Sequence, residues 1–174
     1  MKKSILITAL FVVAVLFSNE TTAQKFRGLD KSPADIAMYS TKADGAIAKV
    51  IYSRPQLKGR DMAKLAPAGK VWRLGANEST EVRFYKDVTF GGQAVKAGRY
   101  SLFTIPDDGE WTIILSTAKN VWGAYFYKQD EDVVRVKGKV SESDDTIEAF
   151  SMIFDDKMNL HMGWGKTIIT VTIK

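Results

Sequence analysis

The sequence predicts an all-β fold, a single antiparallel β-sandwich or a jelly-roll-like domain. After residue 23, short segments rich in β-branched and aromatic residues alternate apolar and polar side chains, as half-buried strands do. Clusters of glycine, proline, asparagine and aspartate separate these segments roughly every eight to twelve residues. No segment after residue 23 repeats its apolar residues at a helical period. This combination is typical of β-sandwiches and jelly rolls.

The first two expected strands flank a tight turn. Residues 34–40 form the first strand and residues 46–53 the second, with Asp44 and Gly45 at the turn between them. The side chains expected to face inward from the second strand are Ala46, Ala48, Val50 and Tyr52.

Residues 54–70 break the alternating pattern with a basic, irregular connection. Prolines and glycines punctuate it, and residues 61–65 are expected to form one helical turn. Long irregular connections in compact domains are often functional. Residues 74–79 are expected to form a second loop, followed by a strand over residues 81–86 with Val82 and Phe84 inward.

The remaining chain alternates between strands and turns. Residues 121–128 are rich in aromatic residues and are expected to form either a strand or an irregular crossing. Turns are expected at residues 141–145 and 155–159, and Gly165 is expected to separate the last two strands. The other strands are expected at 88–90, 99–105, 111–116, 133–140, 146–154, 160–164 and 167–173.

The N-terminus has the layout of a secretory signal peptide. Lys2 and Lys3 precede an apolar stretch over residues 5–17, and Ala23 is the expected last residue before cleavage. The alternative is a membrane anchor, but a spanning helix needs about 20 apolar residues. We therefore expect an exported protein, periplasmic or extracellular, without a membrane span after cleavage. Its parts are the signal peptide (1–23), a flexible lead (24–33) and one β domain (34–174).

Composition excludes several classes of function. Removing Lys2, Lys3 and Glu20 with the signal peptide lowers the net charge from +5 to +4, which does not indicate nucleic-acid binding. The chain has no cysteine and one histidine, so thiol nucleophiles, iron–sulfur clusters and multi-histidine metal sites are excluded. We expect no cofactor and no metal site, and the sequence leaves the oligomeric state open.

Several longer segments resemble a known family. In order, they are YSRPQLKGR, GKVWRLGANEST, GGQAVKAGRYSLFTIP, WTIILS and VWGAYFY. Together with the valine–basic strand that follows, they make the chain similar to DUF2911, an exported bacterial domain of unknown function that is common in Bacteroidetes. The resemblance covers roughly residues 34–174 and implies a single exported β-rich domain. It implies no reaction, substrate or catalytic residue.

A candidate ligand site combines the basic connection with the loop after it. Arginine and lysine suit an anionic ligand, whereas an aromatic ring beside amide and carboxylate groups suits a sugar. In the alternative, the charges are solvated, Trp72 packs in the core, Arg73 pairs with Glu78 or Glu81, and Asn77 satisfies the loop backbone. The residues proposed for this site are Arg54, Lys58, Arg60, Trp72, Arg73, Asn77 and Glu78.

Secondary candidates are Trp122, Tyr125 and His161. Trp122 and Tyr125, together with Tyr127, form either an exposed platform or a cap on one end of the sandwich. His161 is either a general base or a hydrogen-bonding side chain, since no nucleophile motif accompanies it. The leading hypothesis is a binding module for a small anionic or sugar-like ligand. The alternatives are a hydrolase that uses Glu78 or Glu81 with His161, and a module that binds proteins through a sheet edge or aromatic patch.

Overall fold

A computed structural model describes residues 24–174, and within them the all-β prediction is confirmed. The predicted signal peptide lies outside the described residues. Residues 24–33 carry no helix or strand and lead into the first strand. The elements in chain order are β1 (Ala34–Thr41), β2 (Gly45–Ser53), α2 (Met62–Leu65), β3 (Thr80–Phe84), β4 (Val88–Phe90), β5 (Gln93–Val95), β6 (Gly98–Ile105), β7 (Glu110–Ser116), the 3-10 turn Gln129–Glu131, β8 (Asp132–Phe154) and β9 (Leu160–Val171).

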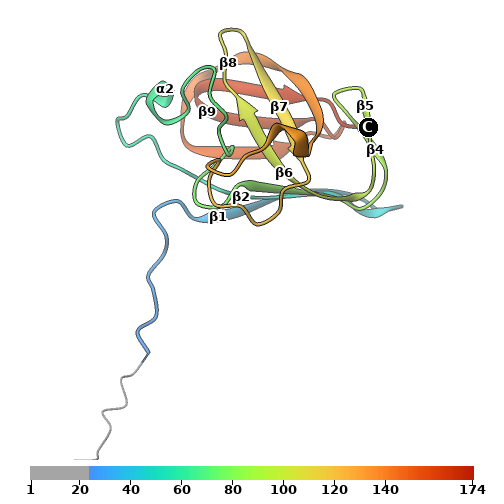
Figure 1. Ribbon diagram of the computed structural model, residues 1–174, viewed down its shortest axis with the longest axis horizontal. Coiled ribbons are helices and arrows are strands. Elements are labelled where there is room, and N and C mark those ends of the chain that lie inside the picture. The colour runs from blue at the N-terminus through green and yellow to red at the C-terminus, as the bar shows by residue number, and fades with distance from the viewer. Residues whose placement is uncertain (1–23) are drawn as a thin grey trace, which may run out of the picture.

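Seven of these strands form one antiparallel sheet in the order β1-β2-β3-β6-β7-β8-β9. The sheet curls, so that the β8–β9 hairpin lies across from β1 and β2 and the core fills the space between them (Figure 1). The two layers of the predicted sandwich are therefore two parts of a single sheet. The short hairpin β4–β5 is tied to the C-terminus, where Phe90 forms a bridge with Ile173.

Strands β8 and β9 are longer than predicted. The predicted turn at residues 141–145 and the predicted break at Gly165 are wrong, because both strands continue through these positions. The hairpin register shifts between Glu142 and Ile147 and again between Ile147 and Ser151, so extra residues of β8 bulge outward. Bulges bend a strand without ending it. Polar side chains on such a bulge resemble a turn in the sequence.

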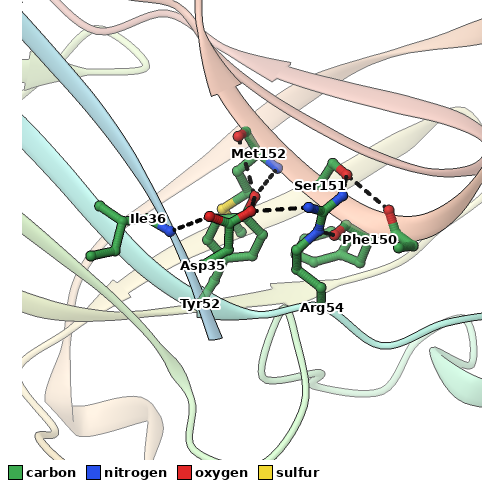
Figure 2. A network of polar contacts seen from close by, with 8 residues as sticks. Asp35, Ile36, Tyr52, Arg54, Phe150, Ser151 and Met152 are labelled. Carbon is green, nitrogen blue, oxygen red and sulfur yellow. Dashed lines mark hydrogen bonds and ion pairs between the residues drawn. The ribbon is translucent and has the colours of Figure 1, made fainter. Parts of the chain in front are cut away.

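The curled sheet closes along a seam between the end of β2 and the second half of β8. Residues 55–57 pair with 148–150 through the Gln56–Ala149 bridge and the Leu57 N–H to Glu148 carbonyl bond. Beyond this short ladder, side chains make the closure (Figure 2). Arg54 donates to the carboxylate of Asp35 (3.1 Å), the Phe150 carbonyl (3.1 Å) and the Ser151 hydroxyl (2.7 Å).

The core is dominated by aromatic residues from distant parts of the chain. Trp72 stacks on Trp164 with ring centroids 5.2 Å apart and planes 10° from parallel. Its edges meet Trp111 and Phe150 in T-shaped contacts. Burying such large rings contributes much of the hydrophobic stabilisation. The backbone around Trp72 is held by a bridge to Thr104 of β6.

The basic connection after β2 contains the expected helical turn. Asp61 caps α2 by accepting a hydrogen bond from the Ala63 N–H, and this satisfies one free donor of the first turn. Across residues 24–174, no helix has the length and apolar character that crossing a membrane requires.

Candidate functional site

Two loops from different parts of the chain lie side by side. The first, residues 73–79, leads into β3, and the second, residues 117–128, links β7 to β8; we call the second the aromatic loop. The Gly123 N–H donates to the Asn77 carbonyl (2.9 Å), and the Ser79 N–H donates to the Val121 carbonyl (2.9 Å). These bonds fix the aromatic loop against the entrance to β3.

The aromatic loop is also anchored to the outer face of the sheet. Tyr127 packs edge-on against Phe103 of β6, with ring centroids 5.2 Å apart. Its hydroxyl donates to Asp132 (2.6 Å) and accepts from Arg135 (3.0 Å). Burial and the neighbouring Asp132 carboxylate raise the pKa of Tyr127, so its hydroxyl stays protonated as a donor. The loop is held at both ends and is therefore preorganised.

Between these anchors, the loop presents three aromatic rings to solvent. Trp122 is 58% exposed, Phe126 72% and Tyr125 80%. Exposed apolar side chains that gather in one patch often mark a binding surface. Of the predicted platform, Trp122 and Tyr125 are thus exposed, whereas Tyr127 packs on Phe103 and is not part of the surface, and Phe126 adds a ring that sequence reasoning left out of the platform.

Arg73 lies half-buried beside Tyr125. Burial lowers the pKa of Arg73, and the neighbouring Tyr125 acts in the opposite direction. Its Nε atom is buried and has no hydrogen-bond partner among residues 24–174. Among residues 24–174, Arg73 forms no ion pair with either predicted partner, Glu78 or Glu81, and Glu81 pairs with Arg99 instead. Arg73 therefore places a guanidinium under the aromatic loop without a carboxylate to neutralise it.

Asn77 and Glu78 lie where the two loops meet. Asn77 adopts a left-handed backbone with φ of 61°, which asparagine tolerates better than most residues, and its amide donates to Asp30 (3.3 Å). Its main-chain carbonyl accepts the bond from the aromatic loop, whereas its side chain contacts Asp30, so the predicted side-chain role of Asn77 in satisfying the loop backbone is not seen among residues 24–174. Glu78 forms an isolated bridge with Trp122 and is exposed.

Glu78 also lines a groove on the outer face of β2, β3 and β6. The groove consists of two adjoining depressions of about 280 Å³ and about 190 Å³ that share Ile51, Glu81 and Arg99. We call it the outer groove. The larger depression is also lined by Ala34, Tyr52, Ser53, Glu78, Ser79 and Asn120, and the smaller one by Lys49, Arg83 and Tyr85.

The structure does not bring the basic connection to this site. Arg54 is engaged in the seam, and Arg60 donates to the carbonyls of Leu57 (2.9 Å) and Gln56 (2.6 Å) within its own loop. The side chain of Lys58 is exposed, but it lines neither depression of the outer groove. The predicted anion site that combines these residues with Arg73 is therefore not assembled.

Trp72 is placed in the core and not in a ligand site. Only 6% of its surface is exposed, and other aromatic side chains cover both its face and its edges. It cannot offer a ring face to a sugar. The predicted stacking role is wrong for this residue, and the alternative of a core tryptophan is correct.

His161 lies in the β8–β9 hairpin, away from the outer groove. Its Nδ1 contacts the Thr170 hydroxyl (2.8 Å), and its Nε2 contacts the Asp155 carboxylate (3.2 Å). Neither Glu78 nor Glu81 is among its polar contacts. Among residues 24–174, His161 therefore makes no direct contact with either acid that the predicted hydrolase pairs with it. In the same part of the chain, no three histidine, aspartate or glutamate side chains come together as metal ligands.

Sequence reasoning missed Lys49, Arg83, Arg99 and Asn120 as groove residues. Alternation does place Lys49 on the outward face of its strand, and it places Arg83 opposite the inward Val82 and Phe84. It does not tell which strands are neighbours. The register that sets Lys49 beside Arg83 and Arg83 beside Arg99 is a tertiary property.

Fold and site together define a curled β domain with a charged surface groove and an adjoining exposed aromatic loop. The chain belongs to the family described as Protein of unknown function (DUF2911), whose model matches residues 32–173. This confirms the predicted family. No curated protein and no solved structure matches the chain.

Proposed function

We propose that this protein is an exported, non-enzymatic binding module for carbohydrate, and that the outer groove and the aromatic loop hold the ligand. The observation that carries the proposal is the set of exposed rings of Trp122, Tyr125 and Phe126 beside a groove with polar walls. Sugar rings present apolar C–H faces that pack on aromatic rings, and hydroxyls that need planar polar partners. Export rests on the N-terminal segment of the sequence, residues 1–23.

The polar partners in the groove suit sugar hydroxyls. Glu78 supplies carboxylate acceptors, Asn120 supplies both donor and acceptor, and Ser79 supplies a hydroxyl. Ser79 is itself oriented, since its hydroxyl donates to Ser101, whose hydroxyl in turn donates to the Ala118 carbonyl. A preorganised site loses less entropy on binding. Of the two ligand classes considered from the sequence, the sugar-like one therefore has more support.

Calorimetric titration against a panel of plant, algal and bacterial oligosaccharides tests the proposal. One member of the panel should bind. Trp122→Ala should weaken that binding about ten-fold or more, because a ring stacked on the sugar should contribute at least about 1.4 kcal/mol to the binding free energy. Phe126→Ala should weaken it as well. The matched control is Phe26→Ala, since Phe26 is 91% exposed but belongs to the lead. Unchanged affinity in the Trp122 variant would refute the assignment.

A second candidate is a protein-interaction module, favoured by exposed apolar side chains on the edge strand. Ile36 is 55% exposed and Met38 57% exposed, and both belong to β1 at one end of the sheet order. Sedimentation velocity distinguishes this candidate. Self-association that rises with concentration and disappears in Ile36→Ser with Met38→Ser supports interaction through β1. A monomer at all concentrations that still binds oligosaccharide supports the carbohydrate proposal.

A further inference from the structure

Three cations stand in one row across the outer face of the sheet. Lys49 of β2 is paired in register with Arg83 of β3, and Arg83 is paired with Arg99 of β6. Like charges directly opposite one another on neighbouring strands destabilise a sheet. This arrangement therefore destabilises the sheet, so a contribution to stability does not explain why the three cations lie together.

Nearby acids neutralise only part of the row. Arg99 forms an ion pair with Glu81. Within residues 24–174, Lys49 and Arg83 form no ion pair, and the Arg83 guanidinium instead lies over the Tyr85 ring, 4.6 Å from its centroid. Two of the three positive charges are thus left to interact with solvent or with a ligand.

The row forms the floor of the smaller depression of the outer groove. This depression is lined by the three cations together with Ile51, Glu81 and Tyr85, so it carries a net charge of +2. Glu78 lies in the larger depression, on the side of the aromatic loop. The groove is therefore positive near Arg83 and negative near Glu78.

We infer that the ligand is an extended acidic oligosaccharide with one oxyanion-bearing sugar, a uronate or a sulfated residue, held over Lys49, Arg83 and Arg99. This inference rests on the proposed carbohydrate function. Arginine forks bind carboxylate and sulfate through parallel hydrogen bonds, and the Tyr85 ring offers an apolar face beside them. A neutral sugar occupies the end near Trp122, because Glu78 would repel an anion there.

The dimensions of the groove support an oligomer in place of a single sugar. The groove-lining residues from Glu78 to Tyr85 follow β3 and its two ends, and at about 3.3 Å per residue they span at most roughly 23 Å. That length exceeds one sugar ring several times over. The two ends of the groove can therefore contact different sugars of the same chain.

Calorimetric titration with matched acidic and neutral oligosaccharides tests the inference. The probes are xylotetraose bearing one glucuronic acid, a short oligogalacturonate and a sulfated galactan tetrasaccharide, each beside its carboxyl-reduced or desulfated counterpart. At least one acidic member should bind about ten-fold or more tightly than its neutral counterpart, and added salt should narrow the difference. Comparison of the uronate and sulfate pairs identifies which oxyanion is recognised.

Arg83→Gln should remove the preference for the acidic probe while leaving the affinity for its neutral counterpart within about two-fold. The matched control is Arg27→Gln, which removes the same charge from the lead and should retain the preference. Because Arg83→Gln also relieves repulsion in the row, its melting temperature should equal or exceed that of the unaltered protein. A clearly lower melting temperature would show a structural role for Arg83 and overturn the inference.

The binding results separate the two proposals. Neutral probes that bind as tightly as their acidic counterparts overturn the acidic-ligand inference and leave the carbohydrate function standing. Failure of every probe in both panels to bind refutes the carbohydrate function, and the inference fails with it.

Discussion

At the scale of single residues, the four tryptophans of this chain illustrate how identical side chains take opposite roles. Trp72, Trp111 and Trp164 pack against one another in the core, whereas Trp122 is largely exposed on the aromatic loop. Valine precedes both Trp72 and Trp122, and the residue that follows each tryptophan does not itself predict a strand. Their local sequences therefore do not separate them.

This difference gives the first prediction. Trp72→Ala should lower the free energy of unfolding by about 3–5 kcal/mol, because it leaves a large cavity among aromatic rings. Trp122→Ala should lower it much less, by about 1 kcal/mol or below, because more than half of its surface is already exposed. Urea unfolding followed by circular dichroism measures both. A large loss of stability in the Trp122 variant would mean that the ring is a structural cap.

A second prediction concerns acid. Asp155 accepts hydrogen bonds from Asn159, Lys157 and His161, and these contacts lower its pKa from 3.8 to about 2. Because the pKa of Asp155 is lowered in the folded state, its ionised carboxylate stabilises the fold at pH values above the ordinary pKa of 3.8. That contribution is lost as the pH falls from about 4 towards about 2.

We therefore expect Asp155→Asn to be less stable than the unaltered protein at neutral pH, and to lose less stability between about pH 4 and about pH 2. Urea unfolding at a series of pH values measures the slopes. Asp156→Asn is the matched control, since the neighbouring Asp156 side chain is exposed and should leave the acid slope unchanged. If the free energy of unfolding falls equally with pH in Asp155→Asn and in the unaltered protein, Asp155 is not the source of the acid sensitivity.

At the scale of elements, glycines allow strands to approach closely on the curled sheet. Gly138 of β8 lies between Ile113 and Ile169 of the neighbouring strands, and a Cβ atom there would come within 2.5 Å of Ile169 Cγ2. Real Cβ atoms do not approach this closely, so a larger residue would force the Ile169 side chain or the backbone beside it to shift. Gly138 thus helps to set the spacing within the layer.

Gly138→Ala should lower the free energy of unfolding by about 1–3 kcal/mol, the usual cost of overpacking a core. Gly28→Ala in the lead is the control, because no atom lies within 4 Å of its added Cβ. Chemical denaturation of both variants measures the difference. Equal stability of the two variants would show that Ile169 and the backbone beside it can shift at little cost.

The elements also show where local patterns mislead. The strands predicted at 34–40, 46–53, 99–105 and 111–116 are confirmed, because runs of β-branched and aromatic residues between turn residues mark them. The polar residues Ser143, Asp144 and Asp145 look like a turn, yet they belong to a bulge of β8. A bulge and a turn have similar residues, and the pairing of the flanking strands distinguishes them.

At the scale of the whole molecule, the seam between β2 and β8 decides whether the sheet stays curled. Arg54 connects Asp35, Phe150 and Ser151 across this seam. Arg54→Ala should lower the free energy of unfolding by about 2 kcal/mol, because several hydrogen bonds from a charged group are lost and their acceptors partly regain solvent. Lys58→Ala, an exposed change in the same connection, should be neutral.

The same variant should open the molecule locally. Hydrogen exchange at the amides of Leu57, Phe150 and Met152 should become faster in Arg54→Ala, since their hydrogen bonds cross the seam. Amides within the β6–β7 ladder should show a smaller change. Uniform acceleration throughout the sheet would mean that the seam and the ladder open as one cooperative unit.

The sequence by itself determined the all-β class, the family, most strand positions and the inward face of the first strands. These are local properties, because alternation and turn residues act over a few neighbours. It also pointed to Arg73, Asn77, Glu78, Trp122 and Tyr125, which the fold brings to one region. Their gathering could not be read locally, since it depends on the pairing of two loops far apart in the chain.

Only the tertiary structure decided which charged residues are available to a ligand. Arg54 was predicted to belong to the ligand site and is held in the seam, whereas Arg83 was not predicted to belong to it and lies in a row of three cations. The physical reason is that a charge is available or engaged according to the partners within a few ångströms. In a curled sheet, those partners come from strands whose order and register no local pattern encodes.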